Sequence, residues 1–339
     1  MDEWLKRYLV CPQDKRPLSL TGDKLICPEN HRYLVIDGVP VMLFDDGSPT
    51  HDYIGHSLEK VARIEAGEKI EDVVDLTENS AGEIDEFVKK ELPYTCGNLY
   101  FSIQDKLARY PFPDLRLPDG AGKRFIDVGC NWGRWTIPAE QKGYRAVGID
   151  PSLNAILAAR RIARQNGVEP LFVVGDARFL PFAEGCFDVA FSFGVLQHLN
   201  KTSAKMSLGE MSRVVKSEGS IVVQMANKYG IRCLYHQARA GLREAREGVD
   251  CFYWTPAELV GTFTEHFGET NVSADCFFGL NIQKTDIDLM PFGHRMVIRS
   301  SEFLRGMSGK FKPLVKFADS LYLTSINKKE KRSAATSKG

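Results

Sequence analysis

Apolar runs alternate with helix-like stretches from about residue 123 onward. Runs at 124–129, 146–150, 171–175, 187–193 and 219–225 predict five β-strands. The stretches between them carry apolar residues at helical spacing. Strands that alternate with helices are typical of a parallel sheet covered by helices on both faces. The pattern therefore predicts an α/β fold.

Local signals set the expected ends of the helices. Pro151 fits the first turn of a helix that stops at Asn166-Gly167. Thr202 is expected to cap the next helix, which ends near Glu218-Gly219. Pro138 falls inside the helix expected after the first strand, so that helix is either kinked or irregular in its first turn.

Aspartates stand at the ends of the first three strands. Asp127-Val128-Gly129 opens a glycine-containing turn, an order that presents backbone N–H groups and a helix N-terminus to a nucleotide-like ligand. Asp150 lies 21 residues after Gly129, where a carboxylate accepts hydrogen bonds from ribose hydroxyls. Asp176 ends the third strand. Each aspartate alone is also a common helix cap, but three in series favour a ligand site.

These segments resemble the class I S-adenosylmethionine (SAM)-dependent methyltransferases of the small-molecule type. The matching motifs are Asp127–Gly133, Gly148–Asp150, Gly175–Ala177, Leu180–Phe182, Phe187–Ser192, Val195–Leu199 and Glu210–Lys216. Asn131 replaces the usual middle glycine, and Asn tolerates left-handed backbone better than most residues. The resemblance implies a Rossmann-like sheet that binds SAM. A nicotinamide-dependent dehydrogenase is disfavoured because Gly-x-Gly-x-x-Gly is absent.

The resemblance also implies roles for individual residues. Gly129, Cys130 and Gly133 line the methionine part of SAM, with Asp127 near its amino group. Asp150 binds the ribose, Asp176 and Ala177 the adenine, and Ser192 to Gly194 the space beneath the sulfonium. The complete expected cofactor set is Asp127, Gly129, Cys130, Asn131, Gly133, Trp135, Asp150, Pro151, Asp176, Ala177, Ser192, Phe193, Gly194 and Gln197.

His198 is the expected catalytic residue. Methyl transfer is an in-line displacement, so the protein must align the reactants and, for an O–H acceptor, remove a proton. Histidine is the commonest general base near neutral pH. The alternative is that His198 only orients its loop or packs.

Two related knuckles precede this domain. Cys11-Pro12 and Cys27-Pro28 each follow an apolar pair, and residues 33–43 predict a hairpin with an Asp37-Gly38 turn. Cys11, Asp14, Cys27 and His31 offer sulfur, oxygen and nitrogen ligands of the kinds that bind Zn²⁺. The alternative is a ribbon without metal, held by its hairpin.

This N-terminal segment resembles two kinds of zinc ribbon. One is the small activator subunit of certain methyltransferases, which ends in a similar Asp-Gly-x-Pro-x-Met-Leu. The other is the N-terminal ribbon of bacterial ribosomal-RNA guanine-N1 methyltransferases, which has Cys-x2-Cys followed by Cys-x3-His. Asp14 stands where the second cysteine of the first knuckle is expected.

The remaining segments carry weaker signals. Residues 48–122 predict a linker, followed by a helical patch at 84–88 and a helix over 99–110. This segment forms either a lid over the cofactor or helices that only pack against the domain. The expected lid contacts are Tyr94, Asn98 and Tyr100. Residues 229–247 predict an arginine-rich helix, and Thr255–Glu258 is a capping box. Residues 295–316, basic and apolar, favour a solvated face, an anionic-substrate site or a membrane-surface helix.

The composition of the chain limits its expected partners and its expected cellular location. Net formal charge is zero over 339 residues, so no global field attracts nucleic acid. No apolar run reaches the length of about 18 residues needed to span a membrane, and no signal-peptide pattern opens the chain. Eight scattered cysteines predict reduced thiols and a cytoplasmic location. The expected division is 1–47 ribbon, 48–122 lead-in, 123–326 methyltransferase domain and 327–339 disordered tail.

The sequence therefore favours a SAM-dependent methyltransferase with a small-molecule or a lipid- or glycan-linked acceptor, methylated on oxygen. Peripheral membrane contact is compatible with this prediction. One alternative is an RNA base methyltransferase, which the resemblance of the ribbon favours. The ribbon has no cluster of basic residues for binding RNA, which argues against this alternative. A second is a non-catalytic SAM-binding scaffold whose ribbon recruits a partner.

Overall fold

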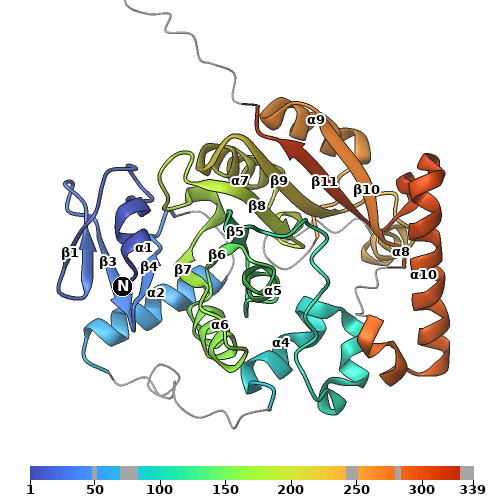
Figure 1. Ribbon diagram of the computed structural model, residues 1–339, viewed down its shortest axis with the longest axis horizontal. Helices are drawn as coiled ribbons and strands as arrows, with labels where there is room; N and C mark the ends of the chain where they lie inside the picture. Colours follow the sequence, from blue (N-terminus) through green and yellow to red (C-terminus); the bar gives the residue numbers. More distant parts are fainter. Residues whose placement is uncertain (48–51, 69–82, 242–250, 279–283, 329–339) are drawn as a thin grey trace, which may run out of the picture.

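One continuous sheet runs through the molecule, from the N-terminal ribbon at one edge to a C-terminal hairpin at the other (Figure 1). The computed structural model describes residues 1–47, 52–68, 83–241, 251–278 and 284–328. Within them, eleven strands follow the order β1-β2-β3-β4-β7-β6-β5-β8-β9-β11-β10. The linker predicted at residues 48 and 49 lies outside the described residues.

The five predicted strands form the parallel centre of this sheet. They are β5 (Arg124–Val128), β6 (Arg145–Asp150), β7 (Leu171–Gly175), β8 (Phe187–Phe193) and β9 (Val215–Ala226). Helices α5 (Thr136–Gln141), α6 (Leu153–Gln165) and α7 (Lys201–Val214) alternate with them. The predicted α/β, Rossmann-like class is confirmed. Two antiparallel strands that the apolar pattern did not show, β10 (Thr270–Cys276) and β11 (Ser320–Ile326), complete the sheet.

Several predicted helix ends are wrong. Helix α6 begins after Ser152, whose hydroxyl accepts from the Ala155 N–H, so Pro151 precedes the helix. Helix α7 is capped by Asn200, not Thr202, and ends at Val214, where β9 begins directly. Pro138 lies in the first turn of the short α5, where a missing N–H costs no hydrogen bond.

The N-terminal ribbon is part of the main sheet. It comprises α1 (Glu3–Tyr8), β1 (Ser19–Thr21), β2 (Lys24–Ile26), β3 (Arg32–Ile36) and β4 (Val39–Met42). The predicted hairpin is confirmed: β3 and β4 flank a turn in which Asp37 and Gly38 both have positive φ. Strand β4 then pairs in parallel with β7. The ribbon thus extends the central parallel sheet.

The lead-in differs from its prediction. Helices α2 (Asp52–Glu65) and α4 (Glu86–Cys96) run below the sheet in Figure 1, and α4 continues past Pro93. The predicted helix over 99–110 is wrong. Two 3₁₀ turns, η1 (Asn98–Ser102) and η2 (Gln104–Lys106), take its place. Tyr100 and Ile103 are both buried, and their spacing of three matches the 3₁₀ period.

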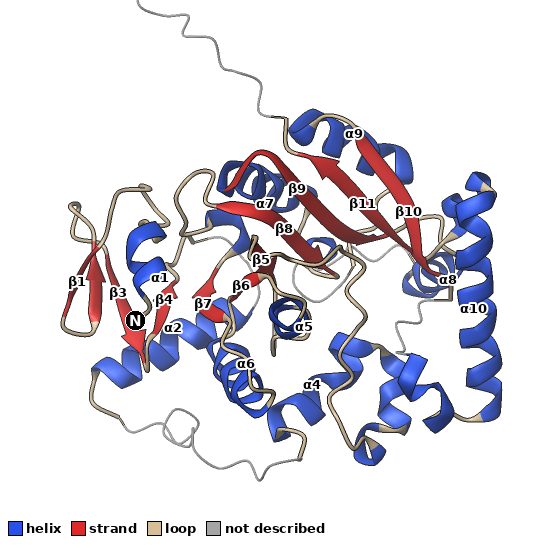
Figure 2. Ribbon diagram, viewed as in Figure 1, coloured by secondary structure: helices blue, strands red, loops and turns tan. Residues whose placement is uncertain are grey.

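The C-terminal part adds helices around the far edge of the sheet (Figure 2). They are α8 (Ile231–Ala240), α9 (Pro256–Phe267), η5 (Lys284–Leu289), α10 (Phe292–Lys310) and η6 (Lys312–Phe317). The capping box of α9 is confirmed, and residues 242–247 of the predicted arginine-rich helix lie outside the described residues. Asn327, predicted to begin the tail, is fully buried, and its amide donates to the Val215 carbonyl at 2.9 Å.

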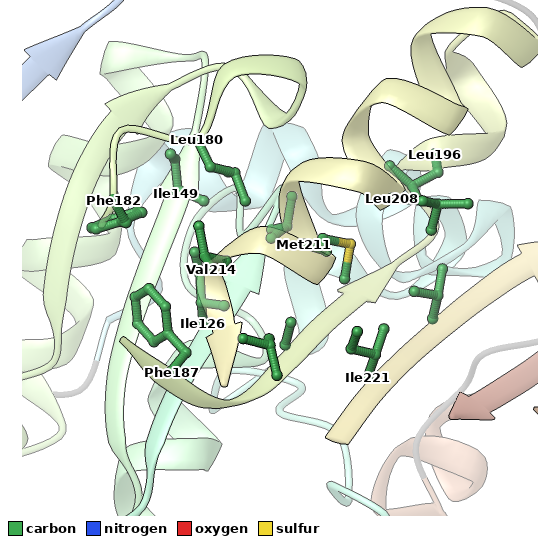
Figure 3. Close-up of a cluster of buried hydrophobic side chains, with 14 of the residues drawn as sticks. Ile126, Ile149, Leu180, Phe182, Phe187, Leu196, Leu208, Met211, Val214 and Ile221 are labelled. Carbon is green, nitrogen blue, oxygen red and sulfur yellow. The ribbon is translucent and has the colours of Figure 1, made fainter. Parts of the chain in front are cut away.

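The core lies on both faces of the parallel strands. Figure 3 shows Leu208, Met211 and Val214 of α7 packed over Ile126 and neighbouring strand residues. These three residues follow helical spacing, whereas the strand residues beneath them alternate between the two faces. The packed helices hold the strand ends, and therefore the loops after them, in fixed positions.

Candidate active site

A cavity of about 440 Å³ opens at the carboxyl ends of β5, β6, β7 and β8. This is the edge at which open parallel sheets bind their ligands. Its wall contains twelve of the predicted site residues: Gly129, Cys130, Asn131, Trp135, Asp150, Pro151, Asp176, Ala177, Phe193, Gly194, Gln197 and His198. The chain folds these residues, spread over 70 positions of sequence, around one space.

The turn after β5 requires glycine at its first position. Gly129 has φ +81°, and a Cβ there would lie 2.3 Å from the Val195 side chain. The backbone N–H groups of Gly129 and Cys130 both donate to the Ile149 carbonyl. Because the N–H groups of Asn131 and Trp132 are also bonded, the prediction that this turn offers free amides is wrong.

Asp150 ties the turn to the end of β6. Its Oδ2 accepts from the Asn131 N–H and its Oδ1 from the Ser152 N–H, both at 2.9 Å. Asn131 occupies the left-handed region with φ 45°, as its side chain allows. Burial raises the pKa of Asp150 to about 6, although these two hydrogen bonds oppose the shift. Each oxygen keeps a lone pair that a hydroxyl can reach from the cavity.

Three predicted cofactor residues lie behind the wall. Asp127 is buried and accepts from the Thr136 hydroxyl at 2.7 Å, and burial raises its pKa to about 7. The Ser192 hydroxyl donates to the Val128 carbonyl at 2.8 Å. Gly133 packs against α5 and α6, where a Cβ would lie 3.2 Å from Ile137. In this structure Asp127, Ser192 and Gly133 lie behind the residues that line the cavity and support them.

Asp176 is held by an arginine that the sequence analysis passed over. The Arg178 guanidinium donates to the Asp176 carboxylate at 2.6 Å and lies 3.1 Å from Asp46, just beyond β4. Arg178 is only 5% exposed. The carboxylate predicted to bind adenine is therefore fixed by an ion pair that reaches into the N-terminal ribbon.

Other wall residues were also missed. Arg134 and Gln224 are buried at the wall, and Glu91 and Thr95 reach it from α4. Burial raises the pKa of Glu91. Arg134 directly follows Gly133 in the glycine turn, so its position in the motif was an available signal. No local pattern could have placed α4 beside the turn.

A second cavity of about 780 Å³ adjoins the first. Tyr94, Gly97, Gln197, His198 and Gln224 belong to both walls. Residues that line only the second cavity include Asn98, Arg232, Cys233, His236, Cys251, Tyr253 and Asp319. Of the predicted lid contacts, Tyr94 and Asn98 reach a cavity. Tyr100 does not, because it is buried and donates to Asp286 at 2.8 Å.

Arg232 places a positive charge on one side of the second cavity, with His236 beside it. They lie one turn apart on α8, and the Arg232 Nε donates to the His236 Nε2 at 3.1 Å. Asp319, at the start of β11, accepts from the Arg232 and Cys233 N–H groups and so fixes the first turn of α8. Burial, followed by the nearby Arg232, lowers the pKa of His236.

His198 lies in η4 (Leu196–His198), at the junction of the two cavities. The neighbouring Gln197 holds this turn in place, because its Oε1 accepts from the Ala226 N–H at 2.9 Å. The backbone carbonyl of Gln197 also accepts from the Phe252 N–H. The turn after β8 is thus fixed from both β9 and the segment before α9.

The family comparison decides what this part of the chain is. Residues 125–219 match the family described as "Methyltransferase domain". These residues form a class I, SAM-dependent methyltransferase domain. The match covers β5 through the start of β9, and so includes the carboxyl ends of β5, β6, β7 and β8.

Curated relatives match the same region. The demethylmenaquinone methyltransferase of Renibacterium salmoninarum is 38% identical over 103 residues, which are 30% of this chain and 40% of the relative. The ajmaline N-methyltransferase of Rauvolfia serpentina is 30% identical over 124 residues, 36% of this chain and 41% of the relative. The matches thus span about two fifths of each relative's length.

Solved structures add only a weak likeness. A protein of Pyrococcus horikoshii OT3 covers 73% of this chain and 100% of its own, with 17% identity and a TM-score of 0.45. A similarity at this level adds nothing to the assignment.

SAM is the cofactor expected of this domain, and the first cavity suits it. Its volume lies within the range of about 300–1,000 Å³ typical of small-ligand sites. Asp150 supplies acceptor atoms for hydroxyls, and the buried Arg134 supplies a cation for a carboxylate. The aromatic rings of Trp135 and Phe193 lie 4.6 Å apart between centroids and 5.6 and 5.9 Å from the Arg134 guanidinium. These residues fit a ligand that carries ribose, a carboxylate and a sulfonium.

The predicted metal ligands also come together. One donor atom from each of Cys11, Asp14, Cys27 and His31 lies within 4.8 Å of every other. His31 Nδ1 lies 3.4 Å from Cys11 Sγ, 3.3 Å from Cys27 Sγ and 3.3 Å from Asp14 Oδ2. Ligands of a tetrahedral zinc, bound at about 2.0–2.3 Å, lie about 3.3–3.8 Å apart. The four donors fit Zn²⁺.

Proposed function

We propose that the protein transfers the methyl group of SAM to a small-molecule or a lipid- or glycan-linked acceptor bound in the second cavity, on an oxygen atom. The observation that carries this proposal is that His198 lines both cavities. A cofactor in one cavity and an acceptor in the other would meet at this residue. Relatives named for demethylmenaquinone and ajmaline support a small-molecule acceptor.

SAM supplies an electrophilic methyl group when bound. The residues of this chain provide alignment and proton transfer. Asp150 and Arg134 fix the two ends of the cofactor, and Gln197 fixes the turn that carries His198. In our proposal the imidazole of His198 accepts the proton of the acceptor hydroxyl, which is the role of a general base.

The second cavity favours an acceptor with a polar or anionic group. Arg232 provides a guanidinium that forms paired hydrogen bonds with carboxylates and phosphates. Tyr253 and Asn98 add further hydrogen-bonding groups. This chemistry suits the charged link of a lipid- or glycan-linked acceptor as well as a small acid.

Two measurements test the proposal in sequence. Calorimetry with SAM tests the cofactor site, and absence of binding at millimolar concentration removes the proposal altogether. Incubation with radiolabelled SAM and fractionated cell extract then identifies the acceptor class. Label in the small-molecule or lipid fraction supports the proposal. Label in RNA, or label nowhere despite SAM binding, contradicts it.

We also propose that Cys11, Asp14, Cys27 and His31 hold a structural Zn²⁺. No ligand position is left for a substrate, which is typical of structural zinc. Elemental analysis of the purified protein should give one zinc per chain. Asp14→Ala should lower zinc retention, and Asp23→Ala, in the turn between β1 and β2, serves as the control. A metal-free wild type with an intact fold contradicts this assignment.

A further inference from the structure

Helix α10 buries Ile298 and packs Leu304 partly against the core, yet it exposes several large apolar side chains. Its buried residues are Ile298, Ser301 and Ser308. Phe292 is 78% exposed and Phe303 67% exposed. A helix in water normally turns its apolar stripe toward the core. Here Ile298 and two serines face the core, whereas Phe292 and Phe303 are exposed on a helix that lies at the edge of the molecule (Figure 1).

Four of the exposed apolar residues of α10 form one stripe, and Val297, 41% exposed, lies outside it. At about 100° per residue, the positions of Phe292, Met296, Phe303 and Met307 fall within about 60° of one another around the helix. Met296 is 48% exposed and Met307 41% exposed. Phe311, 57% exposed, is the residue directly after α10 and adds a further exposed ring. We refer to these five residues as the outer stripe.

The inner side of α10 is anchored firmly. The Ser301 hydroxyl donates to the Phe277 carbonyl at 2.8 Å and accepts from the Phe277 N–H at 3.0 Å. These bonds attach the helix to the residues that follow β10. Rotation that would bury the outer stripe would break them, so the outward orientation is fixed.

Cations accompany the stripe. Residues 292–317 contain six basic side chains, Arg295, Arg299, Arg305, Lys310, Lys312 and Lys316, and one acid, Glu302. Glu302 is paired with Arg305. Arg299 and Lys310 are exposed and fall on the same side of the helix as Phe292 and Phe303. Because the whole chain has no net charge, this concentration is local.

We propose that the outer stripe and its flanking cations dock on an anionic lipid surface. Phenylalanine and methionine would enter the boundary of the acyl chains, while arginine and lysine would remain among the head groups. A protein partner could use the apolar stripe alone, but the excess of five positive charges matches an anionic bilayer. Within the described residues no helix is long and apolar enough to span a membrane, so the contact would be peripheral.

The docking helix lies close to the second cavity. Arg232, which lines that cavity, donates to the Phe278 carbonyl at 3.2 Å, next to the Phe277 that anchors α10. Membrane docking does not depend on the proposed methyl transfer. If both hold, the acceptor cavity is carried near the bilayer surface, which suits an acceptor attached to a lipid.

Vesicle co-sedimentation of the full chain tests this proposal. We expect binding to vesicles of phosphatidylcholine with phosphatidylglycerol, weaker binding to phosphatidylcholine alone, and release by salt. Phe303→Asp should weaken binding about tenfold or more, because it places a charge at the centre of the outer stripe. Arg299→Gln and Lys310→Gln should each weaken it about fivefold on the anionic vesicles only.

Leu20→Asp is the matched control, because Leu20 is 41% exposed on β1 and lies in the ribbon. It should bind vesicles as the wild type does. SAM calorimetry of each variant shows that the fold is retained. The proposal is overturned if anionic vesicles do not bind the wild type, or if Phe303→Asp binds as tightly as Leu20→Asp. Dissociation of a wild-type dimer by Phe303→Asp, without vesicle binding, would instead identify a protein interface.

Discussion

The two cavities of this protein are built in different ways. Most of the first wall consists of consecutive strand ends from β5 to β8, with residues between 129 and 199. The second wall gathers residues from positions 93 to 320, on α4, α8, β9, β10 and the start of β11. The wall of the first cavity is thus a local product of the strand–helix pattern, whereas the wall of the second cavity depends on tertiary packing. Mutations should separate the two functionally.

The largest effect is expected at their junction. His198→Gln removes the proposed base but retains a hydrogen-bonding side chain, so methyl transfer should fall about 10²–10⁴-fold. SAM affinity should stay within a few-fold of the wild type, as calorimetry would show. If the rate of methyl transfer is unchanged, His198 serves only to shape the turn.

Gly129→Val should affect the cofactor cavity alone. The new side chain meets Val195 and the backbone has a positive φ, which together cost about 2–5 kcal/mol. We expect SAM affinity to fall about 30-fold or more by calorimetry. Gly209→Ala in α7 is the control, because no atom lies within 4 Å of its Cβ position. If Gly129→Val bound SAM with wild-type affinity, the turn would have rearranged to accept the new side chain.

Arg232→Ala should affect the second cavity alone. Once the acceptor is known, we expect KM for it to rise about tenfold, since a charged hydrogen bond contributes about 1.5–3 kcal/mol. SAM affinity should not change. Arg239→Ala, on the same helix but outside the cavity wall, controls for loss of charge. An equal effect of both variants would point to general electrostatics.

The smallest effect concerns stability and pH. Asp127 has an ordinary pKa of 3.8 and a folded pKa of about 7, so the folded state holds a proton that the unfolded state has released. Its contribution is therefore most favourable at low pH and declines as pH rises toward 7. Between about pH 5 and pH 8 the wild type should lose about 2 kcal/mol relative to Asp127→Asn. Thermal melts of both proteins over this range measure the difference, and parallel profiles would contradict it.

The sequence was informative where structure is local. Strand ends, the Asp37-Gly38 hairpin and the Thr255 capping box each depend on a few adjacent residues, and all three agree with the structure. The clustering of the four candidate metal ligands was predictable for the same reason, because two knuckles of similar pattern carry them. Even so, the caps of α6 and α7 were misplaced by one or two residues, since several side chains there can cap a helix.

Contacts between distant segments could not be predicted. Arg178 reaches Asp46 across 132 positions, and Asp319 accepts from the N–H groups of α8 across 86 and 87 positions. Neither pair leaves a local pattern. The saturated amides of the glycine turn were missed for a related reason, because the Ile149 carbonyl that accepts two of them belongs to the adjacent strand.

The parallel pairing of β4 with β7 has a consequence for dissecting this protein. Val41 and Met42 cover the edge of β7 opposite Val174 and Gly175. A fragment that starts after residue 47 would contain the entire family match and yet leave that edge unpaired. An open edge strand is a template for other chains. Removing the ribbon would thus expose the edge of β7 as an aggregation site. A minimal catalytic fragment should therefore retain the N-terminal ribbon.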